Sequence, residues 1–132
     1  MKLTMHTDGG ARGNPGPSGI GVVISGEKGN ILREVSEYIG KATNNQAEYK
    51  ALIRGLEEAK KLRAGEVEVV MDSELIVKQI KQEYKVKNKD LAPLFARAWN
   101  LLNSFSSYKI RHVKREKNKK ADKLANDAID NK

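Results

Sequence analysis

The sequence predicts an α/β domain with a five-stranded mixed sheet and helices on its faces. Three candidate strands follow one another in the first forty residues, and a tight turn joins the second to the third, which is typical of an antiparallel group. Two later β-branched runs each follow a helical segment, which favours parallel additions to the same sheet. With 132 residues, no linker and no repeat, the chain is expected to form one domain over 1–132.

The N-terminal part is predicted to contain three strands, at 2–8, 19–25 and 31–39. Alternating apolar residues in the first of them place every second side chain on one face. This strand is expected to end at Asp8, where a Gly- and Pro-rich loop over 9–18 begins. Gly29 and Asn30 predict the hairpin turn between the second and third strands, because both residues tolerate a positive φ.

The rest of the chain is predicted to alternate helices with two more strands. The helices are expected at 44–63, 73–82, 91–105 and 118–129, and the strands at 66–71 and 108–113. Thr43 or Asn44 can cap the first helix, because either side chain accepts a backbone hydrogen bond. Residues 83–89 form a basic connector. The predicted order of elements is therefore βββαβααβα.

The composition excludes several classes of protein. The chain has no cysteine, which excludes a disulfide scaffold, a cysteine zinc site and a thiol nucleophile, and fits a reducing compartment. Apolar runs such as 20–24 are far shorter than the roughly 20 residues that span a bilayer, and the N-terminus has no apolar signal stretch. We therefore expect a cytoplasmic protein with no membrane partner. The 25 Lys and Arg against 17 Asp and Glu give a net charge of +8, which suits a polyanion such as nucleic acid.

Four acidic residues stand where a folded sheet could gather them. Asp8 and Asp72 end predicted strands. Glu48 lies early in a helix on its apolar face, and Asp122 lies one turn into the last helix. Taken singly, each has an ordinary explanation as a turn former, a partner of the helix dipole or a solvated acid. Taken together, such carboxylates repel one another and need a cation, and their hard oxygen ligands favour Mg²⁺ or Mn²⁺.

Four motifs that contain these acids resemble those of type 1 ribonuclease H. Residues 8–21, DGGARGNPGPSGIG, are similar to the family's opening signature, and TNNQAE at 43–48 is similar to its second motif. The dipeptide DS at 72–73 and NKKADKLA at 118–125 resemble the third and fourth motifs. The motifs stand in the family order, and the similarity covers nearly the whole chain. The resemblance implies the ribonuclease H-like fold.

The resemblance also implies an activity, the metal-dependent hydrolysis of the RNA strand of RNA/DNA hybrids to 5′-phosphate and 3′-hydroxyl ends. By the same resemblance, the catalytic and metal-binding residues are Asp8, Glu48, Asp72 and Asp122. They would hold two Mg²⁺ ions, which Mn²⁺ is expected to replace, for a two-metal mechanism. All four acids are present, which argues against a relic that has lost catalysis. We expect a monomer, and the start at Met1 favours a free-standing chain.

Five further residues are assigned to the substrate by the resemblance. Asn14, Asn44 and Asn45 match family residues that hydrogen-bond the hybrid near the scissile site, and their amides offer both a donor and an acceptor. Thr43 and Asn88 match the pair that holds a phosphate of the DNA strand. Asn14 and Asn44 are equally well explained as a turn residue and a helix cap, and both roles can hold at once.

The chain departs from well-known members of the family at two places. The step from 82 to 86 is too short for the basic handle that many bacterial members insert, although nearby lysines could supply part of its charge. Many members also carry a histidine in a loop before the last acid. His112 is a candidate, but it lies in a predicted strand, so we favour Arg115 for the loop position. An arginine cannot shuttle a proton, because its pKa exceeds ~12, but it could steady a phosphate.

Residues 109–123 form the densest basic stretch and surround Asp122, which favours attraction of phosphates over simple solubility. The leading hypothesis is therefore a ribonuclease H without the handle. The missing handle motivates an alternative, a catalytically weak module of the same fold that binds RNA/DNA hybrid or double-stranded RNA. A junction resolvase or transposase core is disfavoured, because those families lack the patterns at 14–21 and 43–45.

Overall fold

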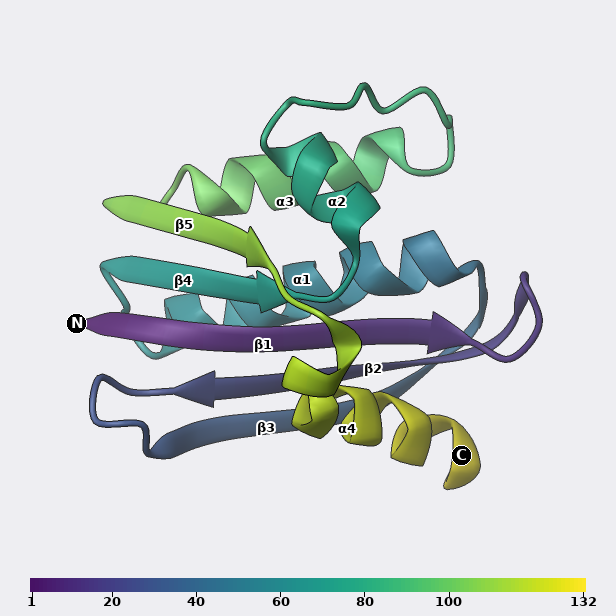
Figure 1. Ribbon diagram of the computed structural model, residues 1–132, viewed down its shortest axis with the longest axis horizontal. Coiled ribbons are helices and arrows are strands. Elements are labelled where there is room, and N and C mark those ends of the chain that lie inside the picture. Colours follow the sequence, from purple (N-terminus) through teal and green to yellow (C-terminus); the bar gives the residue numbers. More distant parts are fainter.

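The computed structural model describes residues 1–132 and contains one five-stranded sheet with helices on both faces (Figure 1). In chain order the elements are β1 (Lys2–Ala11), β2 (Gly16–Ser25), β3 (Ile31–Ala42), α1 (Asn44–Lys61), β4 (Glu66–Met71), α2 (Glu74–Ile80), α3 (Ala92–Leu102), β5 (Ser107–His112), η1 (Arg115–Lys117) and α4 (Lys119–Asp130). This order confirms the predicted βββαβααβα arrangement, with the short 3₁₀ turn η1 added before the last helix.

The sheet has the order β3-β2-β1-β4-β5, with β1 in the centre. The first three strands pair antiparallel, whereas β4 pairs parallel to β1 and β5 parallel to β4. The predicted mixture of antiparallel and parallel strands is therefore confirmed. The pairing of β1 with β4 ends at Thr7 and Met71. Because Asp8 and Asp72 come directly after this last pair, they stand on either side of the point where the two strands part.

The predicted loop over 9–18 is wrong in extent. β1 and β2 continue into this segment and leave only residues 12–15 as a turn, so Asp8 lies within β1 rather than at its end. The glycines in this segment favoured a loop, but at Gly9 the missing side chain makes room for a helix against the sheet. A Cβ on Gly9 would be 2.2 Å from the carbonyl oxygen of Ala47 in α1. Glycine at this position therefore lets the start of α1 approach β1.

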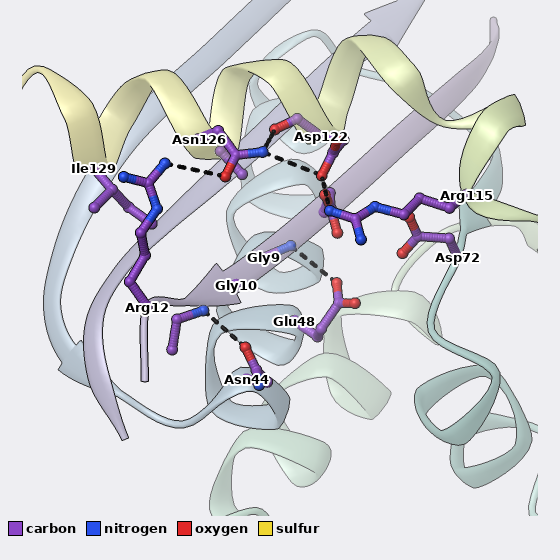
Figure 2. A pocket seen from close by; sticks show the side chains of 13 residues that line it. Gly9, Gly10, Arg12, Asn44, Glu48, Asp72, Arg115, Asp122, Asn126 and Ile129 are labelled. Atoms are coloured by element: carbon purple, nitrogen blue, oxygen red, sulfur yellow. Dashed lines mark hydrogen bonds and ion pairs between the residues drawn. The ribbon is translucent and has the colours of Figure 1, made fainter. Parts of the chain in front are cut away.

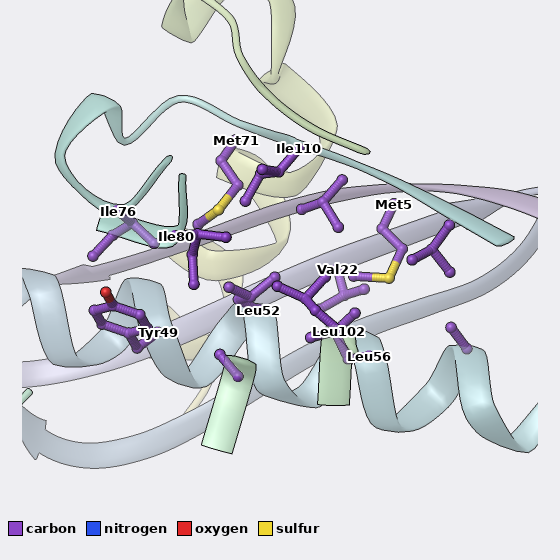
Figure 3. Close-up of a cluster of buried hydrophobic side chains, with 14 of the residues drawn as sticks. Met5, Val22, Tyr49, Leu52, Leu56, Met71, Ile76, Ile80, Leu102 and Ile110 are labelled. Carbon is purple, nitrogen blue, oxygen red and sulfur yellow. The ribbon is translucent and has the colours of Figure 1, made fainter. Parts of the chain in front are cut away.

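Helices cover the two faces of the sheet differently. α1 packs on β1 and β2, and α3 packs on α1, whereas α4 crosses the opposite face over β2 and β3 and also contacts β1 (Figure 1). Large buried side chains fill the space between the sheet and α1 (Figure 3). They include Met5, Val22, Leu52, Leu56, Leu102 and Ile110. Burial of this core fixes α1 against β1, and with it the residues that α1 presents near its start.

Thr43 caps α1 and fixes its first turn. The Thr43 hydroxyl oxygen accepts a hydrogen bond from the Gln46 amide at 3.1 Å, and the Gln46 side chain accepts one from the Thr43 amide at 2.8 Å. This reciprocal pair satisfies two donors that a helix start otherwise leaves free. Of the two caps that the sequence allowed, Thr43 is therefore the one used. Glu48 follows one turn further along the helix.

The helices α2 and α3 are shorter than the predicted segments 73–82 and 91–105. Ser73 caps α2 from outside the helix, and the last residues of both predicted segments form turns. Residues 81–91 between the two helices carry no further helix, in line with the short segment expected in place of a handle. None of the α-helices has the length and apolar character that a membrane span requires.

Candidate active site

Three acidic side chains from different elements meet where β1 and β4 part. Asp8 belongs to β1, Glu48 to α1, and Asp72 follows β4. One carboxylate oxygen of each lies within 4.8 Å of the others. Asp8 and Glu48 are buried, with 7% and 8% of their surface exposed, and Asp72 is half-buried. The sheet topology therefore gathers residues that are far apart in the sequence.

These acids line one end of a cleft of about 470 Å³. Figure 2 shows the cleft between α4 and the start of α1, with Arg12 at the end away from Asp72. The other lining residues are Gly9, Gly10, Ala11, Asn44, Arg115, Asp122, Ala125, Asn126 and Ile129. The cleft therefore has a carboxylate end and an end lined by an arginine, amides and aliphatic side chains.

Asp122 lines the same cleft but is not a member of the three-carboxylate group. Its Oδ1 accepts a hydrogen bond from Arg115 Nη2 at 3.2 Å and lies 3.3 Å from Asn126 Nδ2. The Arg115 side chain is 74% exposed, so solvent screens this ion pair. The structure thus gathers three of the four predicted acids, and α4 places the fourth beside them in the same cleft.

Burial and crowding raise the pKa of all three grouped carboxyls. For Asp8, burial is the largest cause, the charges of Asp72 and Asp122 add to it, and the pKa rises to about 8. Burial raises the pKa of Glu48 well above its usual range, although the Gly9 amide, which donates to Glu48 Oε1 at 2.9 Å, opposes the shift. Burial also raises the pKa of Asp72. The group therefore resists full ionisation unless a cation neutralises it.

The donor set of this group fits a hard divalent cation. Its three members offer only carboxylate oxygens, with no histidine or cysteine among them. Mg²⁺ and Mn²⁺ prefer such ligands, and a bound cation would favour the charged carboxylates that burial disfavours. Burial of these carboxylates therefore accounts for their raised pKa values without metal, and their oxygen atoms account for the kind of ion that would bind them.

Without metal, the free energy of unfolding should fall as the pH rises from 6.5 to 8. The grouped acids hold their protons more tightly in the folded than in the unfolded chain, so the folded state binds more protons over this range and loses stability with rising pH. His6, whose pKa burial lowers from 6.5, acts in the opposite sense mainly below this range. We expect the free energy of unfolding to fall by about 1–2 kcal/mol over this pH range, measured by urea unfolding in chelator. Saturating Mg²⁺ should remove the loss, and a stability that rises with pH in chelator would contradict this account.

The predicted substrate residues lie around two cavities. Asn44 lines the acidic cleft. A second cavity, of about 200 Å³, is lined by Asn14, Thr43, Asn45, Asn88, Asp90 and Leu91. The Asn44 amide donates to Asn14 Oδ1 at 3.0 Å, and the Ala11 amide donates to Asn44 Oδ1 at 2.8 Å. Asn14 and Asn44 therefore hold the local structure through their oxygens, and their NH₂ groups have no protein acceptor.

Of the two loop candidates, the structure places Arg115 in the cleft and His112 outside it. Arg115 begins η1 and contacts Asp122. His112 is the last residue of β5, is opposite Met71 in β4 and does not line the cleft. The predicted strand over 108–113, which includes His112 but not Arg115, is the signal that separates the two residues.

Two cleft residues, Arg12 and Asn126, were not singled out by the sequence. Arg12 lies in the turn after β1, and its guanidinium is 3.3 Å from Asn126 Oδ1 and pairs with Asp130. These contacts join the first turn to the end of the last helix. No spacing rule links positions so far apart, and a basic residue in a Gly-rich turn was the only available signal.

Comparisons with known proteins agree with this geometry. A family model described as Reverse transcriptase-like matches residues 6–128. A ribonuclease H of Pseudomonas fluorescens is 34% identical over 142 residues, which cover 97% of this chain and 92% of that protein. The chain belongs to the ribonuclease H family. The bifunctional protein Rv2228c of Mycobacterium tuberculosis is 47% identical over 131 residues, which cover 98% of this chain and 36% of that protein, so the chain spans about a third of the length of this relative.

Solved ribonuclease H structures have the same fold. RNase H1 of the archaeon Halobacterium salinarum has a TM-score of 0.97 at 41% identity, with 100% of both chains covered. LC11-RNase H1, isolated from compost, has a TM-score of 0.92 at 51% identity, with 98% of this chain and 97% of that chain covered. That structure contains LC11-RNase H1 in complex with an RNA/DNA hybrid. The cleft of this chain therefore lies in a ribonuclease H fold.

Proposed function

We propose that this chain is an endonuclease that hydrolyses the RNA strand of RNA/DNA hybrids and leaves 5′-phosphate and 3′-hydroxyl ends. The observation that carries the proposal is the group of Asp8, Glu48 and Asp72 at the point where the central strands of a ribonuclease H sheet part. The hybrid bound to LC11-RNase H1 supports the choice of substrate. The net charge of +8 suits a polyanionic duplex as well.

The acidic residues would hold two Mg²⁺ ions. Asp8 and Asp72 would contact both ions, and Glu48 and Asp122 would complete one site each. Mn²⁺ would bind the same oxygen ligands. Bound there, the ions would supply an activated water and stabilise the leaving oxygen of the phosphodiester. Asp122 would exchange its contact with Arg115 to complete its site.

Amide and hydroxyl side chains would bind and orient the hybrid. The NH₂ groups of Asn14 and Asn44 would donate to 2′-hydroxyl oxygens or base edges. Thr43 and Asn88 would hold a phosphate of the DNA strand in the second cavity, which Asn45 shares. Because the Asn14–Asn44 hydrogen bond joins the two cavities, the two strands would be held at a fixed separation.

Arg115 would steady a phosphate of the RNA strand. The carboxylate of Asp122 raises the pKa of the Arg115 guanidinium further, so this side chain stays charged and moves no proton. Exposed lysines on the same stretch of chain, Lys114, Lys119 and Lys123, would attract the nucleic acid towards the cleft. His112, outside the cleft, has no part in this proposal.

A second candidate function is a module that binds RNA/DNA hybrid or double-stranded RNA with little catalysis. The absence of a helix over 81–91 favours it, because that is where a handle would grip the hybrid. Such a module would bind with a steep dependence on salt and without metal-dependent turnover. The monomeric state and the cytoplasmic location expected from the sequence stay predictions.

A labelled RNA/DNA hybrid should be cut in Mg²⁺, left intact in chelator and cut again when Mg²⁺ is restored. Duplex DNA of the same sequence should stay intact under all three conditions, and double-stranded RNA in the same panel tests the breadth of the substrate. Binding of the hybrid without cutting in Mg²⁺ or Mn²⁺ would support the binding module instead. Cutting of duplex DNA would point to a resolvase-type nuclease.

A further inference from the structure

The segment 113–118 is attached to both strands at the point where β1 and β4 part. At its start, the Val113 amide donates to the Met71 carbonyl oxygen at 2.9 Å. At its end, Asn118 Nδ2 donates to the Thr7 carbonyl oxygen at 2.9 Å. Thr7 and Met71 are the last pair between β1 and β4, so this segment bonds to each strand immediately before its acidic residue.

Asn118 is the residue through which this segment reaches the acidic group. It is 1% exposed, and its side chain lies near enough to the Asp72 carboxylate to oppose the rise in the pKa of Asp72. Its backbone carbonyl accepts the Asp122 amide at 3.1 Å, and its backbone amide donates to the Arg115 carbonyl at 2.9 Å. One buried asparagine therefore bonds to β1 next to Asp8 and to the helical turn that carries Asp122, and it lies beside Asp72.

Asn118 does not cap α4, although its position just before the helix suggests that role. Asparagine is favoured just before a helix because its side-chain oxygen can accept an amide of the first turn. Asn118 makes no such bond to α4, and its Oδ1 is buried without a partner, which costs free energy. Capping of α4 therefore does not explain why asparagine stands at this position. The hydrogen bond to the Thr7 carbonyl does, because it uses the side-chain amide.

We propose that Asn118 is a positioning residue that sets the relative placement of the carboxylates for metal binding. It is buried and acts through the residues it holds. Groups that orient metal ligands from behind typically change metal affinity 10–100-fold when they are removed. The inference rests on the proposed metal site but not on the proposed substrate.

The test is calorimetric titration of Mn²⁺ into the wild type, Asn118→Ala and Asn118→Ser, at a temperature where circular dichroism shows each protein folded. Serine can cap α4 but is too short to reach the Thr7 carbonyl. We expect the Kd for Mn²⁺ to rise about tenfold in both variants. Tyr49→Phe is the matched control, because it removes another buried hydrogen bond, from Tyr49 to Gln79 at 2.6 Å, and should lower stability without changing the Kd.

An unchanged Kd in the Asn118 variants, with lower stability alone, would overturn the inference and leave the asparagine a structural residue. Failure of both variants to fold would overturn it too, because Asn118 would then hold the fold rather than the ligands. A wild type that binds no Mn²⁺ would overturn the metal site and this inference together. Weaker Mn²⁺ binding in the variants would support it even if the wild type cuts no hybrid, a result that would reject the proposed activity alone.

Discussion

Asp8→Asn should slow cleavage of the RNA strand by about a thousandfold or more while the protein stays folded. Asparagine keeps the size of the side chain but removes the charge that both ions would share. Asp8 is one of three acidic residues, with Glu48 and Asp72, whose carboxylate oxygens lie within 4.8 Å of one another. The measurement is a single-turnover rate on a labelled hybrid in saturating Mg²⁺, which reports the cleavage step rather than product release.

The same substitution should stabilise the metal-free protein, which separates loss of a ligand from damage to the fold. Burial raises the pKa of Asp8 to about 8, so folding at neutral pH disfavours the ionised form that the unfolded chain prefers. Asparagine has no such penalty, and we expect the free energy of unfolding in chelator to rise by about 1–4 kcal/mol. Asp127→Asn makes the same change at an ion pair with Lys123 outside the cleft and should keep the wild-type rate. Full activity of Asp8→Asn would rule out the proposed site.

The sheet could be predicted from the sequence because its connections restrict the topology. A tight turn at Gly29 and Asn30 forces the strands on either side to run antiparallel, as β2 and β3 do. Helices between the later strands allow the parallel pairing of β4 and β5. The predicted strand over 66–71 has the observed bounds. The Gly-rich segment 9–18 was placed in a loop because glycine is disfavoured in strands, whereas at Gly9 the close approach of α1 requires a strand residue without a side chain.

The candidate site could be predicted as a set of residue types but not as a set of contacts. Asp8 and Asp72 were predicted together from expected strand ends, and although β1 continues past Asp8, its parallel pairing with β4 does stop immediately before both acids. The ion pair between Asp122 and Arg115 depends on side-chain conformations that no spacing rule describes. The contact from Asn118 to β1 is less visible still, because in the sequence this asparagine looks like an ordinary helix cap.

Gly21→Ala should destabilise the protein by about 3 kcal/mol. A Cβ at Gly21 would lie 2.1 Å from the Ala121 carbonyl oxygen and 2.8 Å from the Ala125 amide nitrogen. Both are backbone atoms of α4, so no side-chain rotation relieves the contact and the helix must move away from β2. Gly21 is opposite Asp8 in the sheet, and Asp122 follows Ala121 in the helix. The same movement would therefore carry Asp122 away from Asp8.

Gly10→Ala is the matched control, because Gly10 also lies in a strand but a Cβ there would meet no atom within 4 Å. Its φ is not among the positive values of the chain, so alanine should be neutral or stabilise by up to about 1 kcal/mol. Urea unfolding in chelator compares the two variants, and Mn²⁺ titration reports the displacement of α4. Equal stability of the two variants would mean that α4 has room to move. If only Gly21→Ala lowers the free energy of unfolding, glycine is needed at this position because α4 packs too close to β2 for a side chain. The same close packing places Asp122 beside the carboxylates.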